Sequence, residues 1–228
     1  MLIADLSAYR RERIYTLPTT RLVLVRHGET QANREMRYIG RRNDALTEQG
    51  YTQAQQIAEA LAFFPVTAVY SSPLERAYHT ALPIAIRHRL EVQVVDDLRE
   101  CDFGRWEGLS RAEVIASSSH NAEHLQAWLR DPAVAPPDGE SIEAMHKRVQ
   151  TVVEQLVQAH ADQTLVLVSH VGPIKALLCA ALGAPTSTIF RIFLDPATIS
   201  VIDWQQPFPF VRLMNSHAHL GWEQARWM

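Results

Sequence analysis

The sequence predicts an α/β protein: a three-layer α/β/α sandwich with a mostly parallel sheet and a small helical insert. Apolar runs alternate with helical patterns along the 228 residues, and these runs lack polar alternation. Strands of this kind are typical of a parallel sheet covered by helices on both faces. No repeat or long linker divides the chain. We therefore expect one domain over residues 1–228, with residues 1–20 as an N-terminal extension and residues from about 105 to 141 as the insert.

The elements can be assigned in chain order. Four apolar runs predict parallel strands: Leu22–Val25, Val66–Tyr70, Val92–Val95 and Leu165–Val168. Apolar side chains spaced three to four residues apart predict helices around residues 54–61 and 142–157. Three further apolar runs near the C-terminus predict additional strands: Ile189–Leu194, Thr198–Trp204 and Phe210–Met214.

Composition excludes several classes of function. The net charge is -3 and no basic stripe is present, so we expect no nucleic-acid partner. No segment has the roughly 20 apolar residues of a membrane span, and the N-terminus lacks the apolar core of a signal peptide. Two scattered cysteines, Cys101 and Cys179, fit a reduced compartment better than a disulfide. We expect a cytoplasmic protein that binds no membrane.

Two predicted strands end in histidine. In "LVLVRHG" and "LVLVSHVGP", His27 and His170 each lie two residues beyond the last valine of their own apolar run. Ligands of open parallel sheets bind outside the carboxyl ends of the strands. A single histidine at such a place is usually satisfied by the backbone. The matched pair instead predicts that both imidazoles face one crevice, provided that their strands are neighbours.

A third strand end leads into a helix with several start signals. In "SSPLERAYHTA" we expect Ser72 as the N-cap, Pro73 at the first helical position and Glu75 closing a capping box. Arg76 then lies in the first turn, beside free backbone N–H groups. A guanidinium at a helix N-terminus makes an anion site, although a solvated surface arginine is the commoner case.

A fourth strand end brings a carboxyl group. Glu100 in "LRECDFGRWEG" follows the predicted strand that ends near Val95, whereas Asp102 and Glu107 are placed less directly. Such a carboxyl group can donate a proton to a leaving group, or it can simply pair with Arg26 or Arg76. The residues alone leave both alternatives open.

Taken in order, these motifs resemble the histidine phosphatase superfamily in its phosphoglycerate-mutase-like branch. The motifs that carry the resemblance are "RHGET" with Asn33, "GRRNDALTEQGYTQA", "SSPLERAYHTA", "LRECDFGRWEG", "GES" and "VSHVGPIKALL". They extend across roughly residues 21–215. The resemblance implies a single histidine phosphatase domain with the fold predicted above. Small-metabolite phosphatases, such as α-ribazole-phosphate phosphatase, are the members most similar to this chain.

The resemblance also implies roles for individual residues. His27 is the expected nucleophile and Glu100 the expected proton donor. A further set is expected to hold the phosphoryl oxygens: Arg26, Arg76, His170 and Asn33. Gly40 lies where the family brings backbone close to the substrate. Val171 departs from the pattern, because many relatives have glycine there, and it changes a pocket wall without removing a charge.

The chemistry explains the residue types. Phosphoryl transfer spreads charge over three oxygens, so its catalysis is mainly positioning and electrostatic stabilisation. Two arginines supply that charge, and we therefore expect neither metal nor cofactor. The expected partner is a small phosphorylated metabolite, such as α-ribazole phosphate or a sugar phosphate. Oligomeric state stays open between a monomer and a homodimer.

Three alternatives compete with a phosphatase. The mutases that this chain resembles carry tyrosine at the position of Phe103 and paired arginines in a longer insert, where this chain offers only Arg130 and scattered charges. We therefore expect hydrolysis. A non-catalytic phospho-ligand module typically lacks the nucleophile or the acid, and both are present. His217 and His219 have chelating spacing, but no set of further ligands accompanies them.

The substrate pocket is also expected to contain aromatic residues. Four of them are candidates for its apolar wall: Tyr38, Phe103, Trp106 and Trp128. Trp106 and Trp128 fit the core of the insert equally well. Cys101, beside Glu100, is expected to be an inert thiol.

Overall fold

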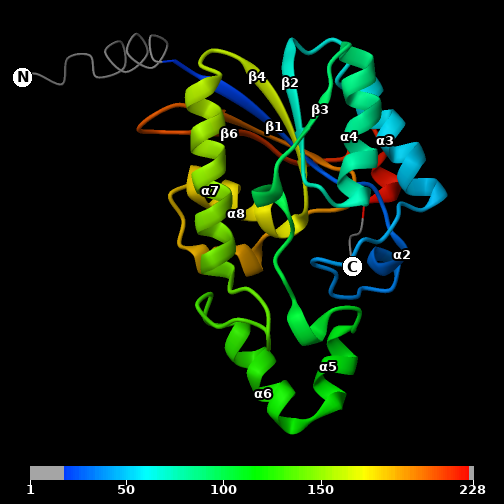
Figure 1. The fold of residues 1–228 in the computed structure, drawn as a ribbon, viewed down its shortest axis with the longest axis vertical. Helices are drawn as coiled ribbons and strands as arrows, with labels where there is room; N and C mark the ends of the chain where they lie inside the picture. The colour runs from blue at the N-terminus through cyan, green and yellow to red at the C-terminus, as the bar shows by residue number, and fades with distance from the viewer. Residues whose placement is uncertain (1–17, 226–228) are drawn as a thin grey trace, which may run out of the picture.

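The computed structural model describes residues 18–225, apart from the side chain of Trp222. Within them, six strands form one sheet in the order β3-β2-β4-β1-β5-β6 (Figure 1). The strands are β1 Thr20–Arg26, β2 Val66–Ser71, β3 Val92–Val94, β4 Thr164–Ser169, β5 Ile199–Trp204 and β6 Phe210–Ser216. The first four run parallel, and β5 and β6 add antiparallel pairs at one side. The predicted mostly parallel sheet is confirmed.

Helices cover both faces of the sheet (Figure 1). One face carries α3 (Glu48–Ala60) and α4 (Glu75–His88), and the other carries α7 (Ile142–Ala159) and α8 (Val171–Ala181). The side chains of β1 show why both faces need cover. Leu22 and Leu24 belong to the core beneath α7 and α8, whereas Val23 and Val25 belong to the core beneath α3 and α4. The strand is apolar without alternation because each face is buried.

The helix α4 begins later than the sequence predicts. It starts at Glu75 and has no side-chain capping bond, so the expected cap at Ser72, the helical position for Pro73 and the capping box are wrong. The buried Ser72 Oγ instead accepts the backbone N–H of Leu74 at 3.3 Å, ahead of the helix, and lies 2.8 Å from Nε2 of His170. Arg76 nevertheless lies in the first turn, as expected.

One of the three predicted C-terminal strands is wrong. Residues Ile189–Leu194 continue a 3-10 helix, η3 (Thr186–Arg191), into irregular chain. Ile189 and Leu194 are buried, whereas Phe193 is 58% exposed, so burial in this run does not follow the alternation of a half-buried strand. The other two predicted strands are confirmed as β5 and β6.

A small helical region projects from the end of the sheet between β3 and α7 (Figure 1). The short helix η1 (Asp96–Leu98) precedes this region. The region itself contains η2 (Gly104–Trp106), α5 (Arg111–Ser117) and α6 (Ser119–Trp128). Ser110 and Glu113 form a capping box that starts α5. The rings of Trp106 and Trp128 meet edge to face, with centroids 5.8 Å apart, and give this small region a core.

The remaining elements are short. They are α2 (Gln31–Arg34) and η4 (Trp222–Gln224). Most of the predicted N-terminal extension, residues 1–17, lies outside the described residues, and Thr20 is already part of β1. Every helix among residues 18–225 is too short or too polar to cross a membrane.

Candidate active site

The two strand-end histidines lie side by side. β1 pairs with β4 in parallel, with Arg26 opposite Ser169, so His27 and His170 leave adjacent strands at the same edge. Their ring centroids are 5.1 Å apart, and both side chains are buried. Neighbouring strands thus bring both imidazoles to one edge of the sheet, as the matched sequences predict.

His27 is held in one tautomer by its own backbone. Its Nδ1 lies 2.7 Å from the carbonyl oxygen of Gly28, and a carbonyl only accepts, so Nδ1 carries the proton and Nε2 keeps a lone pair. Burial, followed by the charges of Arg76 and Arg26, lowers the pKa of His27 well below its ordinary value. The ring is therefore neutral at pH 7, with Nε2 ready to act as a nucleophile.

His170 presents a buried nitrogen without a partner. Its Nε2 pairs with Ser72 Oγ, while Nδ1 has no hydrogen-bond partner among residues 18–225. Burial lowers the pKa of His170 well below its ordinary value, and the nearby charges of Arg76, His27 and Arg26 lower it further. An unpaired buried nitrogen costs free energy, which a ligand at this edge can recover.

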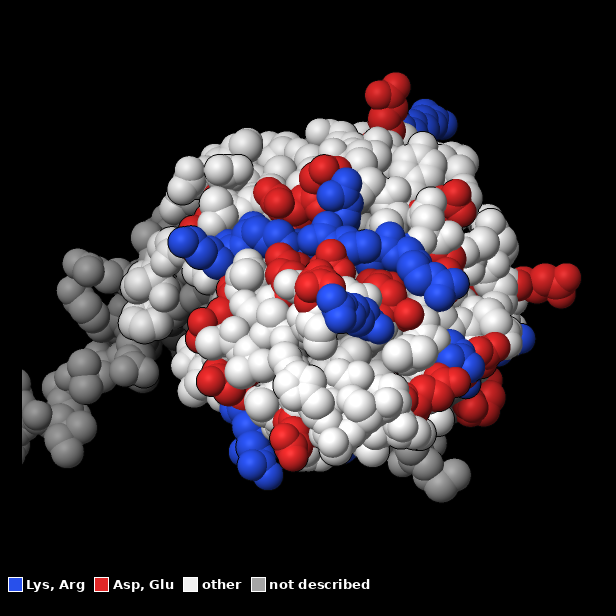
Figure 2. Space-filling view, turned by 60° about the horizontal axis from the view of Figure 1, so that its bottom comes forward, with Lys and Arg blue, Asp and Glu red and all other residues white. Residues whose placement is uncertain are grey.

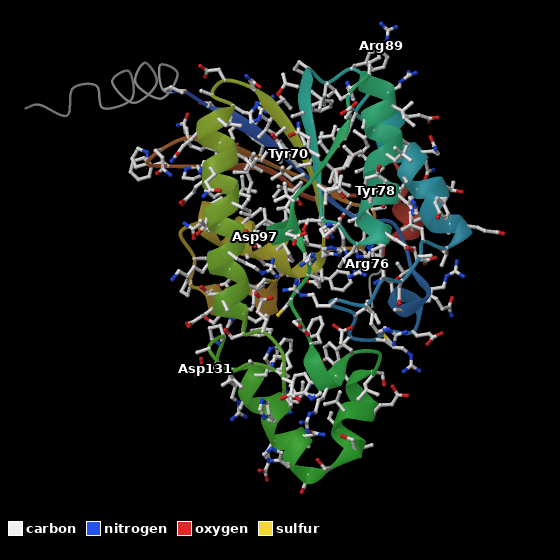
Figure 3. All side chains as sticks on the ribbon, viewed as in Figure 1. Tyr70, Arg76, Tyr78, Arg89, Asp97 and Asp131 are labelled. Atoms are coloured by element: carbon white, nitrogen blue, oxygen red, sulfur yellow. The ribbon has the colours of Figure 1, made fainter. Side chains whose placement is uncertain are left out.

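Arg76 is anchored by backbone carbonyls. It lies at the start of α4, at the end of the sheet nearest the insert, and it is 1% exposed (Figure 3). Nη1 donates to the carbonyl of Arg42 at 2.7 Å, and Nη2 donates to that of Gly40 at 2.8 Å. Glu107 Oε1 in turn accepts the backbone N–H groups of Gly40 and Arg41. The guanidinium is fixed without a carboxylate in contact, so its positive charge stays available.

Arg26 is supported by the segment that precedes β5. Its Nη1 donates to the carbonyl of Leu194, and its backbone N–H donates to that of Thr198 at 3.1 Å. The carbonyl of His27, the residue after Arg26, accepts from the backbone N–H of Ala197 at 2.9 Å. One irregular segment therefore orients both residues at the end of β1.

Glu100 is a buried acid two residues beyond η1. It is 3% exposed, and Oε1 accepts from the backbone N–H of Cys101 at 2.9 Å and of Gly172 at 3.2 Å. Burial raises the pKa of Glu100, against smaller lowering effects of these N–H groups, Arg76 and Arg26. A raised pKa keeps more of this carboxyl group protonated near neutrality than an exposed glutamate.

Two glycines make room for these groups. A Cβ at Gly172 would collide with Oε1 of Glu100, and a Cβ at Gly40 would collide with the carbonyl of Cys101 and with Glu107. Both positions therefore require glycine for close approach. Val171, where the resemblance expects glycine, lies just outside this contact as the first residue of α8 and packs partly buried against the core.

Asn33 is placed differently from the other expected site residues. Its side-chain oxygen accepts the backbone N–H of Thr30, and the Thr30 hydroxyl accepts the backbone N–H of Asn33, which forms a capping box at α2. These two contacts are local, and a part of Asn33 in binding phosphate stays a prediction.

The match to a known family covers this whole site. The sequence model of the histidine phosphatase superfamily (branch 1) matches residues 22–217. This span holds both histidines, both arginines and the buried acid. The chain belongs to this superfamily.

Named relatives and solved structures agree with that assignment. The chain is 40% identical over 203 residues to a bifunctional protein of Mycobacterium tuberculosis, covering 88% of this chain and 55% of that protein. It is 36% identical over 202 residues to phosphoserine phosphatase 1 of Hydrogenobacter thermophilus (88% and 94% covered) and 35% identical over 206 residues to adenosylcobalamin/alpha-ribazole phosphatase of Escherichia coli (90% and 100%). The structure of mycobacterial glucosyl-3-phosphoglycerate phosphatase matches with a TM-score of 0.78 and 31% identity (87% and 99%). The chain thus spans about half the length of the mycobacterial relative and nearly the whole length of the named phosphatases.

His217 and His219, the pair with chelating spacing, each bond to a protein oxygen. Nε2 of His217 lies 2.8 Å from Asp195 Oδ2, and Nε2 of His219 lies 2.8 Å from the carbonyl of Ala197. Among residues 18–225, no three histidine, cysteine, aspartate or glutamate side chains are grouped to hold a metal ion. These histidines brace the segment that orients Arg26 and His27.

The face of the protein at the insert end carries charges of both signs. Figure 2 shows Lys and Arg side chains in a band across that face, with Asp and Glu on both sides of it. Several arginines near the site are paired with carboxylates, including Arg41 with Glu140 at 3.5 Å and Arg99 with Asp96 at 2.9 Å. The buried Arg76, by contrast, is neutralised by no ion pair within 4 Å among the described residues.

A side chain that no sequence pattern indicates holds the Glu100 segment in place. Arg148 on α7 donates to the carbonyls of Asp97 at 2.7 Å, Arg99 at 2.9 Å and Glu100 at 3.0 Å. It also forms a two-point ion pair with Glu140, at 2.7 and 2.8 Å. Because Arg148 is about 50 residues from these carbonyls, no local pattern could reveal this role.

We expect Arg148→Met to lower the free energy of unfolding by about 3 kcal/mol, because it leaves a partly buried carboxylate and three carbonyls without their donor. Urea denaturation measures this loss. The matched control is Arg105→Met, which removes an ion pair whose side chains are 73% and 68% exposed. Its expected cost is below about 1 kcal/mol. Equal losses in the two variants would contradict the role of Arg148.

Proposed function

We propose that this protein is a phosphatase that hydrolyses phosphate monoesters of small metabolites through a phosphohistidine on His27. The single observation that supports it best is the neutral His27 ring, whose Nε2 keeps its lone pair beside two arginines and a buried acid. In the first step Nε2 attacks phosphorus and the ester P–O bond breaks. Glu100 gives its proton to the departing oxygen.

Hydrolysis of the phosphohistidine completes the cycle. Glu100, now ionised, takes a proton from water, the water oxygen attacks phosphorus, and the N–P bond breaks. His27 returns to its neutral tautomer because the Gly28 carbonyl still accepts from Nδ1. Glu100 is then protonated again, as it was before the first step. The products of the cycle are the alcohol and inorganic phosphate.

The phosphoryl oxygens need cationic and neutral donors. Arg26 and Arg76 supply charge at fixed positions, and the unpaired Nδ1 of His170 offers a further contact in the tautomer that carries a proton there. Asn33 completes the proposed set, and Gly40 brings backbone close to the substrate. Because this donor set carries the charge, the proposed reaction requires no metal or cofactor.

The substrate belongs to the class that the named relatives suggest. Phosphoserine phosphatase, alpha-ribazole phosphatase and glucosyl-3-phosphoglycerate phosphatase are each named for a small phosphorylated metabolite. We extend that class to this chain, with α-ribazole phosphate and sugar phosphates as the first compounds to test.

Mutase activity is the second candidate, and the insert argues against it. A mutase must hold its intermediate while excluding water. Phe103 has no hydroxyl to offer, and Arg105 at the start of the insert is tied to Asp138 at 2.6 Å on the surface. Water therefore reaches the phosphohistidine before a phosphoglycerate can rebind in the other orientation.

The test is a panel of phosphorylated metabolites assayed for phosphate release, in parallel with primed interconversion of 2- and 3-phosphoglycerate. We expect phosphate release from several small monoesters, with and without EDTA, and little interconversion. Primed mutase turnover that exceeds phosphate release from every monoester would assign the site to a mutase. Activity that EDTA removes and zinc restores would show that a metal takes part.

A further inference from the structure

A cavity borders the buried acid where the insert meets the main domain. It has a volume of about 90 Å³, roughly six times the space that one water needs. Its wall includes Glu100, Lys175 and three aromatic side chains, Phe103, Trp128 and Phe190. A proton donor must face the oxygen of the departing alcohol. The space next to Glu100 is therefore where the rest of the leaving group has to lie.

Lys175 is an exception in the helix that carries it. α8 reads "VGPIKALLCAA", and Lys175 is its only charged residue, surrounded on the helix by seven buried positions. Among residues 18–225 no hydrogen bond or ion pair occupies its ammonium group. Burial, with a further effect of Arg26, lowers the pKa of Lys175 to about 8, so it remains mostly protonated at pH 7. A partly buried ammonium without a partner favours an anionic ligand.

A second donor in the same wall is also unpaired. Trp128 is 6% exposed, and its indole N–H is buried without a hydrogen-bond partner among the described residues. Indole N–H groups usually find an acceptor when buried. Two independent donors, one of them cationic, therefore border one small cavity whose remaining wall is mainly apolar and aromatic.

From this arrangement we infer that Lys175 and Trp128 form a specificity subsite for an anionic group on the leaving alcohol. The inference rests on the proposed phosphatase function and names its substrate class. That class is phosphate monoesters whose alcohol is compact and carries a carboxylate or similar anion away from the ester oxygen. The aromatic rings contact the apolar part, and the ammonium binds the anion.

Binding of phosphonates tests the subsite without any turnover. Calorimetry compares phenylphosphonate with its 3- and 4-carboxy derivatives, and the better-binding derivative is used throughout. We expect the carboxylate to tighten binding by wild-type protein about tenfold or more, as a charged hydrogen bond would. Lys175→Met should bring the ratio of the two dissociation constants close to one. Trp128→Phe keeps a ring but removes the N–H, and it should reduce the ratio by a smaller factor.

The chain supplies its own control, because it has only two lysines. Lys147 lies exposed on α7, so Lys147→Met should keep the wild-type ratio. In that variant Lys175 is the only lysine, and its acetylation by acetic anhydride can be followed by peptide mass spectrometry. The carboxylated phosphonate should slow this acetylation more than phenylphosphonate does at equal site occupancy.

Two outcomes would overturn the inference. In the first, wild-type protein binds neither carboxylated phosphonate more tightly than phenylphosphonate. In the second, Lys175→Met weakens all three ligands by the same factor, which would assign the lysine to the phosphoryl group. Failure of the proposed function has a different signature, namely no phosphate release by wild-type protein from any monoester, including phenyl phosphate.

Kinetics provides an independent comparison. Two pairs of substrates differ by a carboxylate. O-phosphoserine is phosphoethanolamine with an added carboxylate. In 3-phosphoglycerate, a carboxylate stands in place of the free hydroxymethyl group of glycerol 3-phosphate. We expect Lys175→Met to lower the ratio of kcat/KM within at least one of these pairs about tenfold, mainly through KM, because the anion is bound equally in the ground and transition states. Ratios that Lys175→Met leaves unchanged in both pairs would contradict the subsite.

Discussion

His27→Ala should abolish phosphate release, with a fall in kcat/KM of more than about 10⁴-fold for every monoester. The variant removes the nitrogen that attacks phosphorus. His170 does not replace it, because its Nε2 is bound to Ser72 Oγ and its Nδ1 carries a proton in the proposed tautomer. In quenched wild-type reactions, the peptide that contains His27 should carry one phosphoryl group. That group should be lost in acid and retained in alkali, as expected for a phosphorus–nitrogen bond. Mass spectrometry of the digested protein checks this.

The control for this experiment is another histidine. His120 is exposed in the insert, and His120→Ala should keep wild-type activity. Circular dichroism and thermal unfolding of His27→Ala establish that the loss of activity is not a loss of fold. Wild-type turnover by folded His27→Ala would remove the covalent mechanism altogether.

Glu100→Gln should slow hydrolysis by a factor that depends on the leaving group. For alkyl phosphates, whose alcohols leave only with a proton, we expect a loss of about 10²–10⁴-fold. For 4-nitrophenyl phosphate the first step needs little protonation, so the second step, which has lost its base, becomes limiting. A burst of nitrophenol close to one equivalent per active site should then precede slow turnover, and stopped-flow absorbance measures it.

The pH dependence of the rate should show that Glu100 acts as the proton donor in the first step. Because burial raises the pKa of Glu100, its acid form persists below that value and is lost as the pH rises through it. Wild-type rates with alkyl phosphates should fall on that alkaline side, and Glu100→Gln should lack this fall. Glu123→Gln removes an exposed carboxylate from the insert, and it should keep the wild-type dependence of the rate on pH. Equal losses for nitrophenyl and alkyl phosphates, without a burst, would show that Glu100 is not the proton donor.

Much of the fold could be predicted because it is encoded locally. The run Leu22–Val25 has no polar position, which identifies a strand buried on both faces, and its near-copy at Leu165–Val168 proved to be the neighbouring strand. The run Ile189–Leu194 has a similar composition but forms no strand. Composition alone does not distinguish a strand from irregular chain that packs only through Ile189 and Leu194.

In the site, too, residues placed by local sequence could be predicted, whereas contacts between distant residues could not. His27, His170 and Glu100 follow strands directly, so sheet geometry brings them to one edge. The start of α4 differs from the prediction: Ser72 bonds Leu74 ahead of the helix and a side chain 98 residues away, and the second contact has no local signal. Lys175 did leave a signal, a single charge in an apolar helix, whereas the contacts of Arg148 with distant carbonyls left none.

The groups proposed to hold phosphate and the wall of the cavity beside Glu100 come from different parts of the chain. Arg26, His27 and His170 lie at the ends of central strands, and Arg76 lies in the first turn of a helix packed on them. The cavity wall is drawn mainly from α8, η3 and the segment 100–103, and the insert contributes Trp128. Apart from Glu100 and Gly172, this wall can therefore vary without changing the groups proposed to hold phosphate. Such a division lets one reaction diversify over many metabolites, and it makes η3 and the part of the insert around Trp128 natural segments to exchange between family members in the laboratory.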